Sequence, residues 1–109
     1  MSRSITDFES RVYEALGRVP AGKVVSYRQM AEWLGIKSAQ AVGQALKRNP
    51  NAPQVPCHRV VRADGSLGGY QGATTLTDPS ILRKVELLKS EGVEFDSEGR
   101  LLNPALLIG

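Results

Sequence analysis

The chain contains 109 residues, of which 41% are hydrophobic and 23% are charged, and it carries a formal net charge of +3. This length fits one domain with one core, so we expect residues 1–109 to form a single domain. Because the sequence has no long apolar run and no signal-peptide core, we expect an intracellular protein without membrane contact. One Cys and one His are too few for a disulfide or a structural zinc site, so no metal or cofactor is expected.

Positive charge is concentrated in the first half of the chain. Residues 1–62 contain ten Lys or Arg and four Asp or Glu, whereas residues 63–109 contain four Lys or Arg and seven Asp or Glu. A basic N-terminal half favours a polyanionic partner that binds mainly through that half. A solvated basic surface without a partner would have the same composition, so charge alone leaves both interpretations open.

The first predicted element is a helix over residues 6–17. Its start is marked by a capping box, in which Thr6 is the N-cap and Glu9 is the third residue of the first turn. Apolar residues recur every four positions along this segment and predict one buried face. Residues 20–22 predict a turn, and a short extended segment follows at Val24-Val25.

Two further short helices are predicted, joined by a turn. The first begins at a second capping box, Ser26-Tyr27-Arg28-Gln29, and runs to Leu34, with Gly35 as its C-terminal glycine. The second is capped by Ser38 and runs to about Lys47. This arrangement is typical of a helix-turn-helix, whose second helix enters the DNA groove with its N-terminal residues. The small residues of that helix suit a close approach to DNA, and equally close packing on a neighbouring helix.

The second half is predicted to begin with loops and a hairpin. Residues 49–53 have the composition of a loop, which leads to Cys57. Val60-Val61 and the Asp64-Gly65 turn predict a β-hairpin, which would form a wing beside the helix-turn-helix. Residues 68–77 predict a further loop.

A last long helix is predicted from Asp78-Pro79, which are suited to the N-cap and N1 positions, to Glu91-Gly92. Residues 93–102 predict a small hairpin. The elements together predict a mostly α fold with small β elements, arranged as a winged helix-turn-helix. The inward face of the last helix is expected to contain Ile81, Leu82, Val85 and Leu88 or Lys89.

The strongest chemical signal is the pentapeptide Pro56-Cys57-His58-Arg59-Val60, which contains the only cysteine and the only histidine of the chain. A free thiol is mostly protonated at neutral pH, and an adjacent imidazole can take its proton. The imidazole does this best when a carboxylate orients it. An isolated Cys-His pair is nevertheless more often structural, because a lone Cys usually behaves as a small buried hydrophobe.

The wider stretch, residues 55–61 followed by Gly68-Gly69-Tyr70, resembles the active-site segment of the O6-alkylguanine-DNA alkyltransferases. The resemblance covers about residues 8–95 and corresponds to the catalytic domain of that family, without the N-terminal domain that many members carry. It implies a monomer that binds double-stranded DNA, flips out an O6-alkylguanine and transfers its alkyl group to Cys57 in a single turnover.

The resemblance also implies roles for single residues. Cys57 matches the alkyl acceptor, His58 the base that takes the thiol proton, and Glu91 the carboxylate that orients the imidazole. Asn49 matches an asparagine that ties the recognition helix to the active-site loop. Tyr27 matches a tyrosine that helps to rotate the nucleotide out and donates a proton to the guanine leaving group.

Further residues are assigned to the DNA contact and to the base pocket. Arg59 is expected to anchor the loop rather than touch DNA. The family usually has an Arg in the place of Gln40 and often a Ser in the place of Gln71, so Gln40 is expected to enter the base stack but to hold the flipped state less strongly. DNA contact is expected from Tyr27, Ser38, Gln40, Ala41, Gly43 and Lys47. The base pocket is expected from Val55, Pro56, Val60, Gly68, Tyr70 and Gln71.

Two other interpretations of the sequence stay open. An alkyltransferase-like sensor would bind alkylated bases and recruit other repair machinery. The length of this chain fits such a short sensor protein, but alkyltransferase-like proteins usually have Trp in the place of Cys57. In a plain helix-turn-helix regulator, the Cys-His pair would be incidental.

Overall fold

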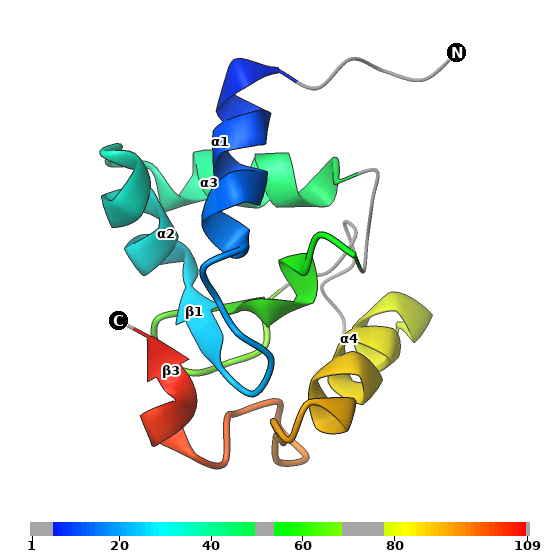
Figure 1. Cartoon of the computed structure of the whole chain (residues 1–109). Coiled ribbons are helices and arrows are strands. Elements are labelled where there is room, and N and C mark those ends of the chain that lie inside the picture. The colour runs from blue at the N-terminus through cyan, green and yellow to red at the C-terminus, as the bar shows by residue number, and fades with distance from the viewer. Residues whose placement is uncertain (1–5, 50–53, 69–77, 109) are drawn as a thin grey trace.

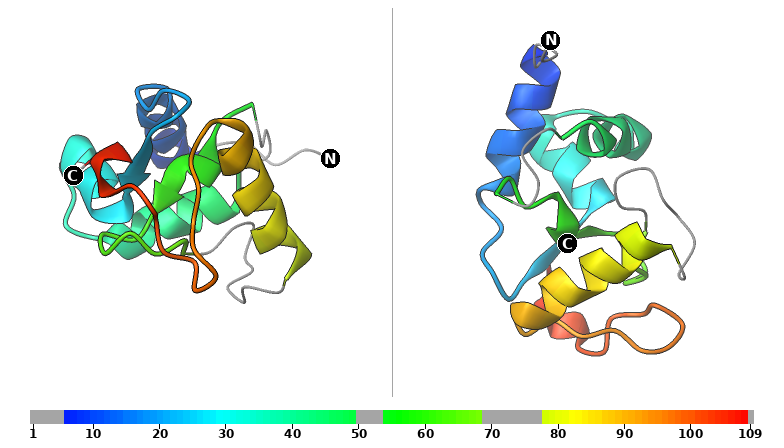
Figure 2. Two further views of the ribbon diagram at one scale, coloured as in Figure 1. Left: turned by 90° about the horizontal axis from the view of Figure 1, so that it is seen from below. Right: turned by 90° about the vertical axis from the view of Figure 1, so that its right-hand side faces the viewer.

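The computed structural model describes residues 6–49, 54–68 and 78–108. Three helices pack on one another on one side of a small sheet, and a fourth lies on the other side (Figures 1 and 2). No helix of the described residues is long and apolar enough to cross a membrane. The elements in chain order are α1 (Asp7–Leu16), β1 (Val24–Ser26), α2 (Tyr27–Leu34), α3 (Ala39–Lys47), the 3-10 helix η1 (Cys57–Arg59), β2 (Val60–Val61), α4 (Pro79–Ser90), the 3-10 helix η2 (Pro104–Leu106) and β3 (Leu107–Ile108).

The first three helices begin at the predicted caps. The Thr6 side chain accepts from the Glu9 amide and the Glu9 carboxylate accepts from the Thr6 amide, each at 3.1 Å, which completes the predicted capping box. Ser26 and Ser38 accept from the amide three residues further on in α2 and α3. Gly35 ends α2 in the left-handed conformation, with φ of 71°. These contacts confirm the predicted caps. The sequence could predict them because each cap depends only on residues within one helical turn.

The sheet differs from the prediction, because its strands are parallel. β1 lies in the centre, with Val25 opposite Val60 on one side and Val24 opposite Leu107 on the other. The predicted turn at Asp64-Gly65 forms, with the Gly65 amide donating to the Arg62 carbonyl at 2.9 Å. The predicted mostly α fold with small β elements is confirmed, but Val60 and Val61 pair with β1 and not with a hairpin partner, so the predicted wing hairpin is wrong.

Burial explains this pairing. Val60 and Val61 are both completely buried, and all three residues of β1 are buried as well. Strands that are buried on both faces consist of continuous apolar residues and are typical of parallel sheets covered by helices. A two-residue strand in a surface hairpin would leave one of these valines exposed to solvent.

The fourth helix begins and ends close to the predicted positions, and its predicted inward face is confirmed at Ile81 and Leu88 but wrong at Leu82. Asp78 caps α4 by accepting from the Ser80 amide at 2.9 Å. Leu82, which was predicted to face inward, is 51% exposed, and the buried residues of α4 are Ile81, Lys84 and Leu88. The predicted hairpin at residues 93–102 is present as an antiparallel bridge between Phe95 and Leu101.

One core joins the helices to the sheet. Its buried residues come from all four α-helices, from β1 and β2, and from the segments between them. Two hydrogen bonds connect α1 to the other two N-terminal helices. Tyr13 donates to the Ala45 carbonyl of α3, and Arg11 donates to the Leu34 carbonyl at the end of α2. η1 lies between this three-helix group and α4, so its residues are held from both sides (Figure 1).

Two glycines should respond in opposite ways to the same substitution. Gly35 has φ of 71°, so Gly35→Ala is expected to destabilise the protein by about 1 kcal/mol. Gly43 lies inside α3, where a Cβ would come no closer than 3.9 Å to Tyr27, so Gly43→Ala is expected to stabilise it by about 0.5–1 kcal/mol. Urea unfolding measures both effects, and a Gly35→Ala variant as stable as the native protein would contradict the C-cap.

Candidate active site

The candidate site is built on η1, which contains Cys57, His58 and Arg59. Cys57 is 5% exposed and His58 is 2% exposed, so both side chains lie inside the protein. The Val60 amide closes the turn by donating to the Cys57 carbonyl. The turn is covered by α1 on one side and by α4 on the other.

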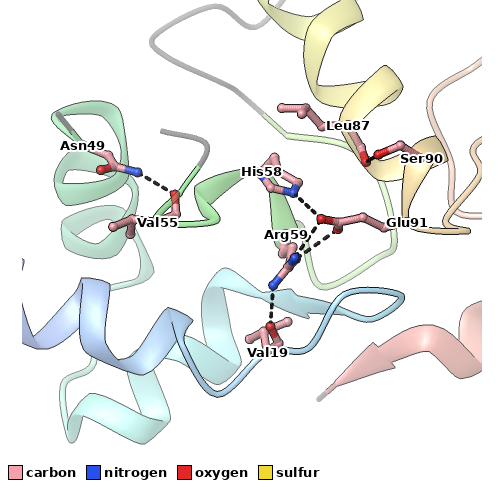
Figure 3. A network of polar contacts seen from close by, with 8 residues as sticks. All are labelled: Val19, Asn49, Val55, His58, Arg59, Leu87, Ser90 and Glu91. Atoms are coloured by element: carbon pink, nitrogen blue, oxygen red, sulfur yellow. Dashed lines mark hydrogen bonds and ion pairs between the residues drawn. The ribbon is translucent and has the colours of Figure 1, made fainter. Parts of the chain in front are cut away.

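The Glu91 carboxylate, directly after the end of α4, binds two residues of η1 (Figure 3). Arg59 donates from Nε to Oε1 at 3.0 Å and from Nη2 to Oε2 at 2.7 Å, in the bidentate geometry that makes such pairs strong. His58 Nε2 lies 3.1 Å from Oε2. The predicted contact between His58 and Glu91 is therefore present, although the two residues are 33 positions apart in the chain.

The same arginine also binds the segment between α1 and β1. Arg59 donates from Nη1 to the Val19 carbonyl at 2.8 Å (Figure 3). Gly22 of this segment lies close to Glu91, because a Cβ at Gly22 would be 3.4 Å from the Glu91 carbonyl oxygen. The prediction that Arg59 anchors the loop is confirmed by these contacts, which join three separate parts of the chain.

Both members of the His58–Glu91 pair have lowered pKa values, for different reasons. Burial raises the pKa of Glu91, but the hydrogen bonds from Arg59 and His58 outweigh it and the net shift is downward. Burial lowers the pKa of His58, and this effect outweighs the attraction of Glu91. As the pH falls, the unfolded chain binds a proton at His58 near the ordinary pKa of 6.5 and at Glu91 near 4.5. The folded protein binds each of these protons only at a lower pH. Stability therefore falls as the pH falls through these values.

These protonation states fix the tautomer of His58. An ionised Glu91 can only accept, so the neutral imidazole must donate its proton from Nε2. Nδ1 then carries a lone pair. This atom is buried and has no hydrogen-bond partner among the described residues. The residue directly after Cys57 thus presents a free acceptor, which is what proton removal from a thiol requires.

Asn49 connects the end of α3 to the segment before Cys57. Its side-chain nitrogen donates to the Val55 carbonyl at 2.9 Å, across residues 50–53, which lie outside the described residues (Figure 3). This contact fits the tie between recognition helix and active-site loop that the resemblance implied for Asn49. The hinge role itself stays a prediction.

Tyr27 lies between α3 and Gly68. A Cβ at Gly68 would be 3.1 Å from both Cε2 and Oη of the Tyr27 ring, and a Cβ at Gly43 would be 3.9 Å from Cε1. Gly68 also has φ of 70°, in the left-handed region. Two predicted site residues from distant parts of the chain therefore meet, and only a residue without a side chain fits at Gly68 without moving the ring.

The other predicted residues are distributed as follows. On α3 and its cap, Ser38, Gln40 and Lys47 are exposed, whereas Ala41 and Gly43 are half-buried. In the predicted base pocket, Val55 and Pro56 are half-buried and Val60 is fully buried in β2, while Tyr70 and Gln71 lie outside the described residues.

Sequence reasoning missed Lys84, whose side chain is completely buried in α4. Its position could have been found from the spacing, because Lys84 lies three residues after Ile81 and four before Leu88, on the same helical stripe. Among the described residues, no group of three or more His, Cys, Asp or Glu side chains could hold a metal ion.

Residues 7–93 match the family model described as 6-O-methylguanine DNA methyltransferase, DNA binding domain. Among curated relatives, the methylated-DNA–protein-cysteine methyltransferase of Methanothermobacter thermautotrophicus is 38% identical over 93 residues, which are 85% of this chain and 48% of the relative. That of Mycobacterium leprae is 45% identical over 87 residues, which are 79% of this chain and 48% of the relative. The chain thus spans about half the length of these two curated relatives.

Two solved structures of DNA complexes are also similar. Mycobacterium tuberculosis OGT in complex with DNA is 44% identical with a TM-score of 0.70, over 82% of this chain and 51% of that chain. S. pombe Atl1, in complex with damaged DNA containing O6-carboxymethylguanine, is 30% identical with a TM-score of 0.73. The match to Atl1 covers 98% of this chain and 99% of that chain.

Removing the Arg59 side chain should destabilise the protein strongly. Arg59→Ala leaves the half-buried Glu91 carboxylate and the Val19 carbonyl without this donor, so we expect a loss of about 2–3 kcal/mol in the free energy of unfolding. The matched control is Arg28→Ala, which removes an exposed pair with Glu32 at 3.9 Å and should cost at most about 0.5 kcal/mol. Equal losses in urea unfolding would show that Arg59 does not anchor the site.

Gly68→Ala should cost more than the left-handed backbone alone explains. Gly65→Ala, the control, has φ of 86° and a Cβ position 3.6 Å from the Leu101 side chain, an ordinary contact, so it should cost about 1 kcal/mol. Gly68→Ala should cost about 1–2 kcal/mol more, because the Tyr27 ring must move. In a double-mutant cycle, Tyr27→Ala should remove the excess. An excess that persists without the ring would refute the contact.

Proposed function

Because the chain belongs to the 6-O-methylguanine DNA methyltransferase family, we propose that it repairs DNA by transferring one alkyl group from O6-alkylguanine to Cys57. The observation that carries the proposal is the hydrogen bond between His58 and Glu91. His58 directly follows the only cysteine of the chain. It supports a neutral imidazole whose Nδ1 can accept a proton. Relatives with about 40% identity are named methylated-DNA–protein-cysteine methyltransferases, which supports the same chemistry.

In the proposed reaction, His58 takes the thiol proton through a bridging water, and the Cys57 thiolate attacks the alkyl carbon. A bond forms between sulfur and this carbon, the bond from the carbon to O6 of guanine breaks, and its electron pair stays on the base. One proton then neutralises the guanine, so the proton lost by the thiol balances the proton gained by the base. Tyr27 is the proposed donor, and its position against Gly68 supports this role. Tyr27 then regains a proton from solvent, and His58 releases to solvent the proton that it took, so that both side chains return to their neutral forms.

The thioether product is stable, so each protein molecule reacts once. The reaction uses only this chain's own side chains and the alkylated base. His58 and Glu91 do not touch the alkyl group in this scheme; His58 accepts the thiol proton as the reaction begins, and Glu91 orients its ring.

The target base must leave the duplex to reach a buried cysteine. The exposed residues of α3, Ser38, Gln40 and Lys47, are the proposed contact with the DNA duplex. The hydrogen bond from Asn49 to the Val55 carbonyl then places the end of this helix next to the segment that enters the active site. In this scheme Gln40 enters the stack where the flipped base was.

A second candidate function is a sensor that binds alkylated DNA without accepting the alkyl group. It is favoured by the match to S. pombe ATL structures in complex with DNA, which covers nearly the whole of both chains. The presence of Cys57 beside a hydrogen-bonded His58 favours transfer. The two functions differ in one measurable product, the alkylated protein.

The mass of the intact protein should increase by one alkyl group after incubation with an oligonucleotide duplex that contains O6-methylguanine. Cys57→Ala should show no increase but should bind the duplex as tightly as the native protein, because the thiol contacts no phosphate. An unchanged mass of the native protein, together with tight binding of the methylated duplex, would favour the sensor.

Gln40→Ala should slow transfer from duplex DNA but not from the free base O6-benzylguanine, which needs no flipping. Gln44→Ala, also exposed on α3, is the matched control and should change neither rate strongly. Gln40→Arg should tighten binding to the duplex and steepen its salt dependence, because an added cation releases further counterions. If Gln40→Ala slows both substrates equally, Gln40 is not the residue that fills the stack.

A further inference from the structure

Lys84 is a buried cationic residue that the proposed reaction leaves without a role. Its side chain is completely buried in α4. The Nζ atom donates to the Val60 carbonyl at 2.8 Å and also to the Leu67 carbonyl. Lysine is rarely buried to this extent unless a partner compensates its charge.

The two carbonyls place the amine at the centre of the candidate site. Val60 directly follows η1, and its amide closes the turn onto the Cys57 carbonyl. Leu67 directly precedes Gly68, against which the Tyr27 ring lies. Lys84 therefore connects the turn that carries the thiol to the segment that lies against the Tyr27 ring, while α4 itself contacts η1.

Neutral carbonyls satisfy the donors of an ammonium but do not neutralise it. The pKa of Lys84 is lowered to about 7, mainly by burial and further by Arg62, whereas a negative charge on Cys57 acts in the opposite direction. Glu91 is already bound to Arg59 and His58. Within the described part of the chain, the two charged groups that shift the pKa of Lys84 are Arg62, which is a cation, and Cys57, whose ionised form is an anion.

We propose that Lys84 is a positioning residue of the Cys57 site, whose buried ammonium holds the turn and is the counter-ion of the Cys57 thiolate. The inference rests on the proposed function in taking Cys57 as the reacting group. Attraction between opposite charges is mutual, so the ammonium that is stabilised by the thiolate also favours ionisation of the thiol. After transfer the sulfur is an uncharged thioether, and Lys84 loses its counter-ion.

Other titratable and charged groups surround this pair and must be kept constant in any test. Arg62, from the segment after β2, acts on Lys84, and Lys84 acts on His58 of η1. Arg59 and Glu91 act on His58 in turn. Lys84 also lowers the pKa of His58, which adds to the effect of burial. The titration of Cys57 must therefore be followed at the cysteine itself and not through activity alone.

The first test is a titration of the Cys57 Cβ by ¹³C NMR in DNA-free protein, where the only cysteine gives a single signal. In Lys84→Gln, the amide can still donate to a carbonyl but the charge is gone. We expect the apparent pKa of the thiol to be higher than in the native protein by about one unit or more. Lys89→Gln removes the same charge from an exposed position of α4 and should leave the titration unchanged. An unchanged thiol titration in folded Lys84→Gln would overturn the proposal.

The second test changes Cys57 and measures the pKa of Lys84, so it does not need a Lys84 variant to fold. Cys57→Ser replaces the thiol by a hydroxyl that stays neutral. The pKa of the Lys84 amine, followed by NMR of the lysine Nζ groups, should be lower in this variant than in the native protein by about one unit. An equal or higher value would overturn the counter-ion role.

Both tests are made without DNA, so their outcome is separate from that of the alkyl-transfer experiment. If the two titrations shift as expected but the protein gains no mass with methylated DNA, the proposed function is wrong and the ion pair stands. If transfer occurs and neither titration shifts, the function stands and the role of Lys84 is wrong.

Discussion

The site depends on the Glu91 carboxylate, because this one group accepts hydrogen bonds from two residues of the same short turn. Arg59 binds both of its oxygens, and His58 binds one of them (Figure 3). Arg59 also reaches the segment between α1 and β1 through the Val19 carbonyl. A carboxylate that is held ionised by an arginine can only accept a hydrogen bond from the imidazole, so the anchoring contact and the chemical contact are the same interaction.

The rest of the fold holds the two ends of this interaction in place. α1 of the three-helix group covers η1 from one side, and α4 brings Glu91 to it from the other. Lys84, seven residues before Glu91 on α4, holds the chain directly after η1 through the Val60 carbonyl. Two charged residues near one helix thus fix the turn at two points, and the thiol lies in a site where burial strengthens each electrostatic effect.

Local features of the structure could be predicted from the sequence, and features that depend on distant pairing could not. The caps at Thr6, Ser26 and Ser38 need only the next three residues, and each was found. The parallel pairing of Val60 with Val25 crosses 35 positions, and turn chemistry at Asp64-Gly65 favoured a hairpin instead. The contact between His58 and Glu91 was expected only through the family resemblance. Lys84 was missed because a lysine within an amphipathic helix normally faces water.

The proton positions on His58 test the account most directly, because it requires a neutral imidazole that donates from Nε2 to Glu91 and keeps Nδ1 as an acceptor. The chain has a single histidine, so ¹⁵N NMR of the native protein reports this ring without ambiguity. At neutral pH we expect the proton on Nε2 and none on Nδ1. A proton on Nδ1, whether as the other tautomer or as the imidazolium, would contradict the account, because no lone pair would be left to accept the thiol proton.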